Sequence, residues 1–339
     1  MAILPFSVRA ADGKLGSMSE TDNTIPTTMK AIGQDVLGGP EVLHEVELPV
    51  PQPGPSEILV RVRATALNPT DWKHRAVEGM FLPEPPFVLG WDVSGEVAAI
   101  GFGVTLFEPG DEVFGMLPYP YGRGAAAEYV TAPARAFARK PANLDHTHAG
   151  AIPLAALTAY QALVDTANVQ AGQRVLIHAA SGGVGHFAVQ IAKSLGAHVT
   201  ATASAANHDF LRTLGADEVL DYRTTDFAET VRNIDMVLDP IDSPHALRSL
   251  RTLNPGGIVV SIRATGTDEL YAEAEKLGVR AIAMLVEADH AGMEAIRELA
   301  ESGALRPTLA GVFPLADAAK AHALGDTGRT VGKLVLTVE

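Results

Sequence analysis

The chain of 339 residues contains no cysteine at all. Disulfide bonds, thiolate nucleophiles and cysteine-ligated zinc are therefore excluded. Positive charge is also scarce, because 26 Lys and Arg residues stand against 40 Asp and Glu residues and leave a net charge of −14. A nucleic acid partner, which needs a basic surface, is not expected, and small molecules are the expected partners.

Long hydrophobic runs are missing as well. No apolar stretch approaches the roughly 18 residues of a membrane span, so no membrane partner is expected. Residues 1–10 lack the long apolar core of a signal peptide, so we expect a cytoplasmic location. Residues 1–28 are expected to form a flexible extension, because regular patterning begins only at Met29.

The most informative segment runs from Arg174 to Lys193. Apolar residues 175–177 predict a buried parallel strand, and apolar side chains at helical spacing after it predict a helix. Between them stands Ala180-x-Gly182-x-x-Gly185, the dinucleotide fingerprint with alanine in place of its first glycine. Glycines permit a tight turn and close approach of a ligand, and the N-terminus of a helix attracts anions. The segment therefore predicts a pyrophosphate-binding loop.

The residues after the second predicted strand, 198–203, indicate which dinucleotide binds. An NAD-dependent enzyme usually presents Asp or Glu at this strand end, where the carboxylate binds the ribose hydroxyls. Here the chain reads Ser204-Ala-Ala-Asn207, and the nearest acid, Asp209, lies further on. Small polar groups donate to a 2′-phosphate without repelling it, so NADPH is the expected cofactor.

The spacing of apolar residues divides the rest of the chain. Alternation and frequent turn residues from 29 to 150 predict an antiparallel β-barrel. Strands alternating with helical stretches in 151–285 predict a Rossmann-type, doubly wound parallel sheet. These strands are expected at 174–179, 198–203, 218–222, 234–238 and 257–262. Residues 286–339 end in a lone strand at 333–338, which needs a partner and is expected to return to the barrel.

Several separate motifs occur along the chain in a fixed order. They are Asn68-Pro-Thr-Asp-Trp72, Gly90-Trp-Asp-Val-Ser-Gly95, Gly110-Asp-Glu-Val113, Leu157-Thr-Ala-Tyr160, His178-Ala-Ala-Ser-Gly-Gly-Val-Gly185, Leu214-Gly-Ala-Asp217 and Gly328-Arg-Thr-Val-Gly-Lys333. Together they resemble the zinc-independent quinone oxidoreductase branch of the medium-chain dehydrogenase/reductase superfamily, from Met29 to the last residue. The resemblance implies a GroES-like substrate domain formed by 29–150 and 286–339, a Rossmann domain at 151–285, and an active site in the cleft between them.

The resemblance also implies positions around the cofactor. Asn68 and Thr158 would lie near the nicotinamide, and Ser204 and Asn207 near the 2′-phosphate. The pyrophosphate would lie on Ser181, Gly182, Gly183 and Val184. Tyr222 would lie beside the adenosine, and Arg329 and Lys333 would reach the cofactor from the C-terminal segment. Two departures from the family pattern are Asp239-Pro240 and Arg263.

Zinc-dependent relatives hold their metal from the places that correspond to the Asn68 and Gly90 loops, and neither place offers cysteine or histidine here. We expect no metal site. Hydride delivery to an electron-poor quinone or enone needs mainly alignment and charge stabilisation. The catalytic residue stays unknown, with Tyr119 and Tyr121 as candidates for donating to a substrate oxygen. Both tyrosines and Trp72 are expected to line the substrate pocket.

The expected function is NADPH-dependent reduction of quinones or α,β-unsaturated carbonyl compounds, so the expected partner is a small-molecule electrophile. Two alternatives stay open: an enoyl thioester reductase and an NADPH-binding redox sensor without turnover. The resemblance also implies a homodimer joined through an edge strand near 281–285. Of the other polar residues, His178 and His186 are expected to be packing or hydrogen-bonded residues, and Asp71 and Lys73 to form a local polar pair.

Overall fold

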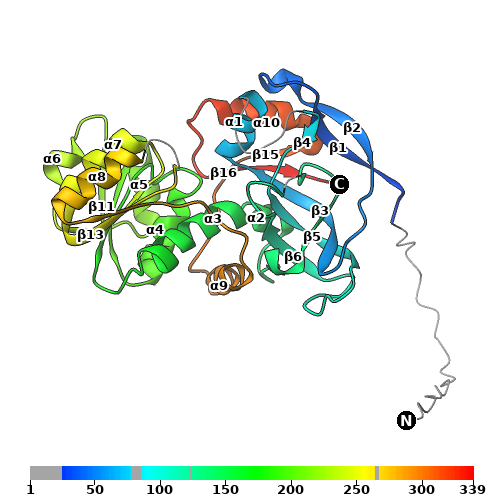
Figure 1. The fold of residues 1–339 in the computed structure, drawn as a ribbon, viewed down its shortest axis with the longest axis horizontal. Helices are drawn as coiled ribbons and strands as arrows, with labels where there is room; N and C mark the ends of the chain where they lie inside the picture. The colour runs from blue at the N-terminus through cyan, green and yellow to red at the C-terminus, as the bar shows by residue number, and fades with distance from the viewer. Residues whose placement is uncertain (1–24, 78–84, 123, 264–266) are drawn as a thin grey trace, which may run out of the picture.

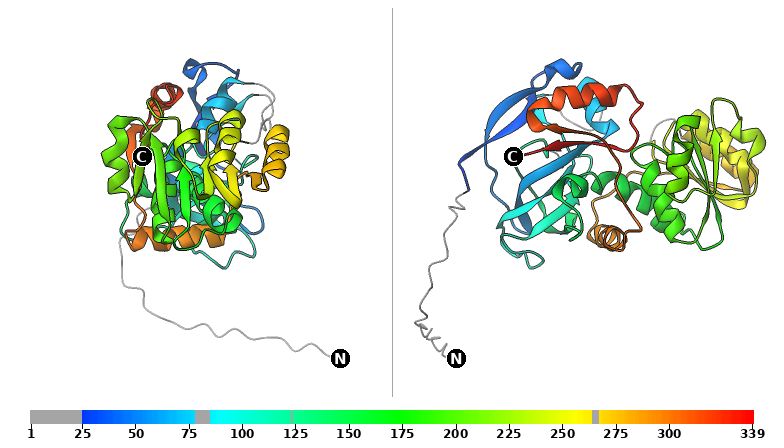
Figure 2. Two further views of the ribbon diagram at one scale, coloured as in Figure 1. Left: turned by 90° about the vertical axis from the view of Figure 1, so that its left-hand side faces the viewer. Right: turned by 180° about the vertical axis from the view of Figure 1, so that it is seen from behind.

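The computed structural model describes residues 25–77, 85–122, 124–263 and 267–339, so the predicted N-terminal extension lies outside the described residues as far as residue 24. The chain forms two lobes, with a parallel sheet in one and mostly antiparallel strands in the other (Figure 1). Helix α3 (Pro153–Tyr160) lies between them, and the view from behind shows the same division (Figure 2). Within the described residues, no helix has the length and apolar character that a membrane span requires.

The strands of the antiparallel lobe are β1 (Thr28–Gln34), β2 (His44–Pro49), β3 (Glu57–Leu67), β4 (Phe87–Val88), β5 (Asp92–Ile100), β6 (Glu112–Met116), β7 (Tyr129–Pro133), β8 (Phe137–Arg139), β15 (Leu309–Pro314) and β16 (Lys333–Thr337). Its helices are α1 (Pro69–Ala76), α2 (His146–Gly150) and α10 (Ala318–Asp326). Strand β3 is the centre of this lobe, because it pairs antiparallel with β5, β7 and β16.

The alternation predicted for β3 is only partly present. Ile58, Leu59 and Val60 are all fully buried, although successive side chains of a strand point to opposite faces. Leu59 packs on Met29 and Ala31 of the small sheet β2-β1-β4, so this part of β3 is covered on both faces. The second layer contributes to the core, which explains why an apolar residue stands at the position that simple alternation would make polar.

The other lobe contains a parallel sheet in the order β11-β10-β9-β12-β13-β14. Its strands are β9 (Arg174–Ile177), β10 (His198–Ala203), β11 (Glu218–Asp221), β12 (Ile234–Asp239), β13 (Leu253–Ser261) and β14 (Arg280–Ala283). Its helices are α4 (Gly185–Ser194), α5 (His208–Thr213), α6 (Phe227–Thr230), α7 (Ser243–Ser249) and α8 (Asp268–Leu277). The doubly wound sheet predicted from the sequence is confirmed, and its strand order reverses between β9 and β12.

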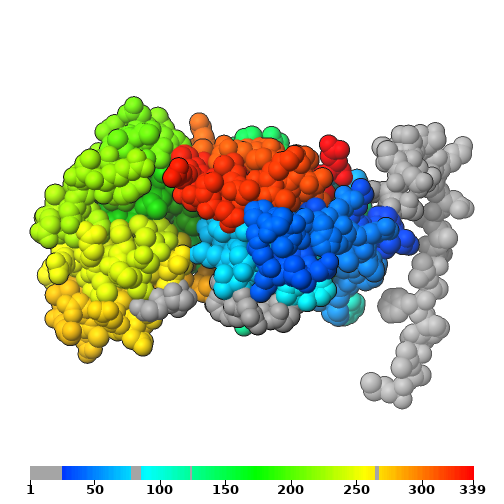
Figure 3. Space-filling view, turned by 90° about the horizontal axis from the view of Figure 1, so that it is seen from above, coloured from blue at the N-terminus to red at the C-terminus, as the bar shows by residue number. Residues whose placement is uncertain are grey.

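The chain after β14 leads through α9 (His290–Glu301) back to the antiparallel lobe. Strand β16 pairs with β3 and β15, which gives the lone terminal strand its predicted partner. In the space-filling view, the C-terminal residues, in red, lie beside the N-terminal residues in blue and extend to the lobe in green (Figure 3). The domain boundaries at residues 150 and 285 stay a proposal, which this pairing of distant segments supports.

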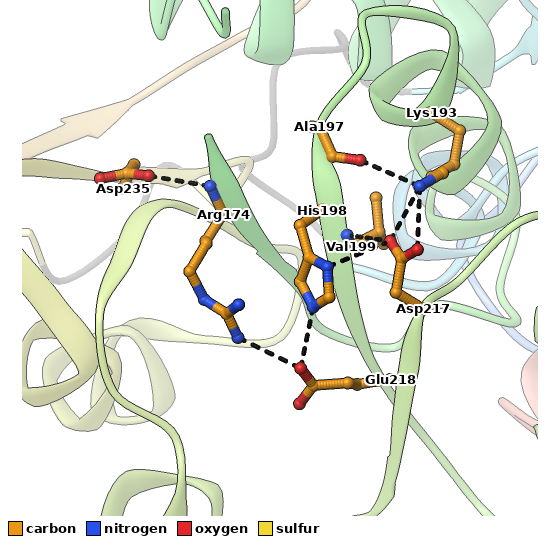
Figure 4. Close-up of polar contacts among 8 residues, drawn as sticks. All are labelled: Arg174, Lys193, Ala197, His198, Val199, Asp217, Glu218 and Asp235. Carbon is orange, nitrogen blue, oxygen red and sulfur yellow. Dashed lines mark hydrogen bonds and ion pairs between the residues drawn. The ribbon is translucent and has the colours of Figure 1, made fainter. Parts of the chain in front are cut away.

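The strands of the parallel sheet begin at an edge that is held together by ion pairs (Figure 4). Glu218 at the start of β11 accepts hydrogen bonds from Arg174 at 3.2 Å and contacts His198 at 2.8 Å. Next to them, Lys193 pairs with Asp217 at 2.9 Å. These side chains are partly exposed, so each pair contributes little to stability. The network aligns the first residues of β9, β10 and β11 at the edge opposite the glycine-rich loop.

Candidate active site

The three glycines of the loop between β9 and α4 have different surroundings. A Cβ on Gly185 would come within 2.5 Å of Ala179 O and 2.6 Å of Ala180 Cα, so this glycine permits close packing of helix on strand. A Cβ on Gly182 would meet only Ala179 O at 3.2 Å, and one on Gly183 would meet Lys333 Cδ at 3.3 Å. The backbone at Gly182 and Gly183 therefore leaves room for a ligand to approach, as a pyrophosphate requires.

Strain is stored at the start of this loop. Ala179 has a φ of 46°, in the left-handed region that side chains rarely adopt, and its carbonyl accepts a hydrogen bond from Gly182 N at 2.9 Å. Residues in such conformations cost free energy and are concentrated at functional sites. The turn thus presents the N-terminus of the ten-residue helix α4 at the edge of the sheet where the strand order reverses.

The residues predicted for the 2′-phosphate lie together. Asn207 Nδ2 donates to Ser181 Oγ at 3.1 Å and to Ser204 Oγ at 3.4 Å, which connects the glycine-rich loop to the end of β10. Ser204 directly follows the last residue of β10, and no acidic residue stands between it and Asn207. The chain thus offers two hydroxyls and an amide at this strand end without a negative charge.

Asn68 and Lys333 are brought together from opposite ends of the chain. Lys333 Nζ donates to Asn68 Oδ1 and to Leu67 O at 3.0 Å, and Asn68 Nδ2 donates to Asp92 Oδ2 at 2.7 Å. Asn68 is 2% exposed and Lys333 is 3% exposed, so both polar ends are buried. Lys333 therefore contacts the Asn68 loop with its ammonium group and the glycine-rich loop with its methylene stem.

Asp71 does not pair with Lys73, so the local polar pair expected from the sequence is wrong. Its carboxylate accepts hydrogen bonds from Asn68 N at 2.7 Å and Gly90 N at 3.0 Å. Residues two apart on a helix do not face each other, which explains the error. Burial raises the pKa of Asp71 to about 7, against the effect of its hydrogen bond from Asn68, so this carboxyl changes charge near neutral pH.

The other predicted cofactor residues differ in exposure. Thr158 is buried in α3, and its hydroxyl donates to Leu154 O at 2.7 Å within the same helix. Tyr222 follows β11 and is 56% exposed, with the Arg223 guanidinium 5.7 Å from its ring centre. Arg329 is exposed. Contacts of these residues with a cofactor stay predictions.

The structure separates the two candidate tyrosines. Tyr119 is partly buried, its hydroxyl lies 3.0 Å from Thr70 Oγ1, and its ring packs edge-on against Trp91. Burial raises the pKa of Tyr119, so its phenol keeps its proton in the neutral range. Tyr121 is 73% exposed.

Trp72 packs against α10, because a Cβ on Gly325 would come within 2.7 Å of the Trp72 ring. The role of Trp72 in the substrate pocket stays a prediction.

His186 links the glycine-rich loop to the returning C-terminal segment. Its Nδ1 lies 2.9 Å from Gly182 O, and its Nε2 accepts a hydrogen bond from Thr308 N at 3.3 Å. Burial lowers the pKa of His186 to about 4, so the ring is neutral and Nδ1 is the donor. Gly332 N also donates to Ser181 O at 3.0 Å. The expectation that His186 is a hydrogen-bonded residue is confirmed.

One further polar cluster lies at the ends of β9 and β12 and in α7, and it was not predicted. The side chains of His178, Asp239 and His245 offer ligand atoms within 4.8 Å of one another. Each has protein partners already: Asp239 contacts His245 Nδ1 at 2.7 Å, and the two nitrogens of His178 contact Thr202 and Ser249 at 3.1 Å each. These hydrogen bonds confirm His178 as a hydrogen-bonded residue.

Fold and site together define a class of protein. A parallel sheet whose glycine-rich loop leaves its backbone open to a pyrophosphate, set beside an antiparallel lobe that contributes buried polar groups, is the arrangement of a dinucleotide-dependent oxidoreductase.

Two family models match the chain. The first, described as alcohol dehydrogenase GroES-like domain, covers residues 54–142. The second, described as zinc-binding dehydrogenase, covers residues 214–336.

Similar proteins extend over most of the chain. A chloroplast envelope quinone oxidoreductase homolog from Arabidopsis thaliana is 34% identical over 88% of this chain and 95% of its own. A 2-haloacrylate reductase from a Burkholderia species is 33% identical over 88% of this chain and 96% of its own. The solved structure of the quinone oxidoreductase from Coxiella burnetii is 36% identical, with a TM-score of 0.86, over 92% of this chain and all of that one.

These similarities show the family. The chain belongs to the quinone oxidoreductase-like branch of the medium-chain dehydrogenase/reductase superfamily. Its two lobes are the GroES-like domain and the Rossmann-type sheet of that fold. The protein is accordingly an NAD(P)H-dependent oxidoreductase of the quinone reductase type.

Proposed function

We propose that this protein is an NADPH-dependent reductase of quinones or α,β-unsaturated carbonyl compounds that works without zinc. The preference for NADPH rests on the groups at the end of β10. There Asn207 donates hydrogen bonds to the hydroxyls of Ser181 and Ser204, and residues 204–207 contain no carboxylate. The open backbone at Gly182 and Gly183 fits a pyrophosphate next to these groups. The substrate class is supported by two relatives, one named as a quinone oxidoreductase homolog and one as a 2-haloacrylate reductase.

When bound, the reduced nicotinamide supplies the hydride. The residues of the chain would hold the reactants and supply a proton. Tyr119 keeps its proton at neutral pH and is less exposed than Tyr121, so we propose it as the donor to the substrate oxygen. We further propose that Asn68 and Thr158 lie beside the nicotinamide, with the adenosine against Tyr222 and the pyrophosphate close to Lys333 and Arg329.

Oxidation of NADPH in the presence of a panel of quinones, enals and enoyl thioesters tests the function. We expect turnover with quinones or enals, unchanged after exhaustive treatment with a chelator, because the chain has no cysteine and His178, Asp239 and His245 are hydrogen-bonded within the protein. Turnover with thioesters alone would support the enoyl reductase. Tight binding of NADPH without any turnover would support the redox sensor. Loss of turnover on chelation, restored by zinc, would contradict the zinc-free assignment.

We also propose a homodimer joined through β14, the outer strand of the parallel sheet. Residues 281–283 are only partly covered, and β14 pairs with β13 on one side alone within the described residues. An outer strand presents unpaired backbone groups to which a second copy can add its own strand. Light scattering is expected to give twice the mass of the 35.6 kDa chain, and the mass of one chain would contradict the proposal. The cytoplasmic location stays a prediction.

A further inference from the structure

A buried ion pair lies where the two lobes meet. Lys333 Nζ is 3.6 Å from Asp92 Oδ2, and the side chains are 2% and 0% exposed. Lys333 begins β16 and Asp92 begins β5, two strands that lie on opposite sides of β3 in the sheet. Asn68 connects the two charges, because its amide oxygen accepts from Lys333 and its amide nitrogen donates to Asp92. The pair is thus bridged by a residue at the start of α1.

The same two side chains contact the elements that surround the proposed cofactor site. The second oxygen of Asp92 accepts a hydrogen bond from Leu154 N at 2.6 Å, in the first turn of α3. A carboxylate at this place also interacts favourably with the positive end of a helix. The methylene stem of Lys333 lies against Gly183, and the residue before it, Gly332, donates to Ser181 O. The pair therefore joins α3, the Asn68 loop and the glycine-rich loop.

Stability does not account for a pair of this kind. Removing two charges from water costs several kcal/mol per ion, and apolar side chains of similar volume are often as stable or more stable. A buried, hydrogen-bonded ion pair instead fixes the relative positions of the segments that carry it, because only one arrangement satisfies the hydrogen bonds of both side chains. Here the arrangement fixes an amide and the first turn of a helix relative to a phosphate-binding loop.

We propose that Asp92 and Lys333 are positioning residues for hydride transfer, because their pair holds Asn68 and α3 in a fixed place beside the glycine-rich loop. This inference rests on the proposed NADPH-dependent reduction. Neither residue is assigned contact with the reacting atoms. A shift of about 1 Å at the reacting centre is enough to lower a rate about 100-fold, so a small displacement of α3 is expected to reduce kcat strongly.

Asp92→Asn and Lys333→Met keep the shape of the two side chains and each remove one charge. We expect kcat to fall about 10- to 100-fold in each variant. In D92N the Kd for NADPH measured by calorimetry is expected to change by about threefold or less. In K333M, NADPH is expected to bind more weakly as well, because the lost charge is proposed to lie close to the pyrophosphate. The fluorescence anisotropy of bound NADPH gives a readout independent of turnover. It is expected to fall in both variants, because the nicotinamide end is held less firmly.

The double variant D92N/K333M separates positioning from folding. A single substitution leaves one charge of the pair buried without its partner and is expected to lower the free energy of unfolding, whereas the double variant removes both charges of the pair. We expect the double variant to recover stability and to keep the low kcat. D326N is the matched control, since Asp326 pairs with the buried Arg75 at 2.8 Å and joins α10 to α1. It is expected to lose stability without a change in kcat or anisotropy.

The pH profile gives a second signature. Burial lowers the pKa of Lys333, while Asp92 and then Asp71 raise it. His186 also faces Lys333 and is neutral. In D92N the largest opposing charge is gone, so Lys333 loses its proton at lower pH and the alkaline limb of kcat/KM is expected to move to lower pH. A purely structural pair would leave this limb in place.

The outcomes separate the two hypotheses. A wild-type protein without turnover on any substrate contradicts the proposed function. An active wild type whose folded D92N or double variant keeps kcat within about twofold contradicts the positioning role alone. Loss of kcat and anisotropy in these variants, together with unchanged kcat and anisotropy in D326N, supports it.

Discussion

A protein carrying Gly182→Val is expected to fold and to lose NADPH binding, with a Kd weakened about 100-fold or more. Gly182 does not adopt a positive φ, so a side chain brings no backbone strain. Its Cβ would meet only one atom, Ala179 O at 3.2 Å, and the free protein therefore has room for valine after a small adjustment. The added methyl groups would occupy the space through which a pyrophosphate reaches the backbone.

Gly185→Ala is the contrasting variant. Its Cβ would lie within 2.8 Å of three backbone atoms of Ala179 and Ala180, so α4 must move away from β9. We expect a loss of about 1–3 kcal/mol in the free energy of unfolding from this overpacking. Urea unfolding and calorimetric titration with NADPH measure the two effects. Near-native affinity in a folded Gly182→Val protein would mean that the phosphates lie elsewhere.

The strand, loop and helix around the glycine-rich loop could be predicted from the sequence. Residues 174–193 carried local signals for each element, namely apolar residues in a run, glycines at fixed spacing and then helical periodicity. β9 and α4 accordingly begin and end within a few residues of their predicted places. The return of β16 to β3 followed from a general requirement, since an isolated strand leaves backbone groups unpaired.

The buried ion pair of Lys333 and Asp92 could not be predicted from local sequence patterns. Lys333 and Asn68 are 265 residues apart, and each was associated with the cofactor only through family resemblance. No periodicity in either segment indicates that an ammonium group is fully buried, and a lysine is rarely so placed. The partner Asp92 was noted only as part of the Gly90–Gly95 motif, and no role was assigned to it. Only the fold brings the starts of β5, β16 and α1 to one point.

Asp71 is different, because a local signal was present. An acidic residue three positions after Asn68, at the start of a helix with proline in its first position, is typical of a helix N-terminus in which the acid binds the first backbone N–H. That contact exists between Asp71 and Asn68 N. The cluster of His178, Asp239 and His245 had no comparable signal, since β9 and α7 meet only through the order of the sheet.

Ser204→Asp is expected to reverse the choice of cofactor. In the wild type, NADPH is expected to bind about tenfold or more tightly than NADH, because Ser204 and Asn207 can donate to a 2′-phosphate and no carboxylate opposes it. An aspartate at the end of β10 repels that phosphate and accepts from the ribose hydroxyls of NADH instead. Fluorescence titration with both cofactors measures the change.

Two controls identify the cause of this reversal. Ser204→Ala removes the hydroxyl without adding charge, so it is expected to weaken NADPH by about threefold and to leave NADH nearly unchanged, as the loss of one hydrogen bond predicts. Because the aspartate acts through charge at a partly exposed strand end, its effect on NADPH is expected to shrink as salt is raised. Equal affinities of the wild type for NADPH and NADH would show that the polar residues after β10 do not select the cofactor.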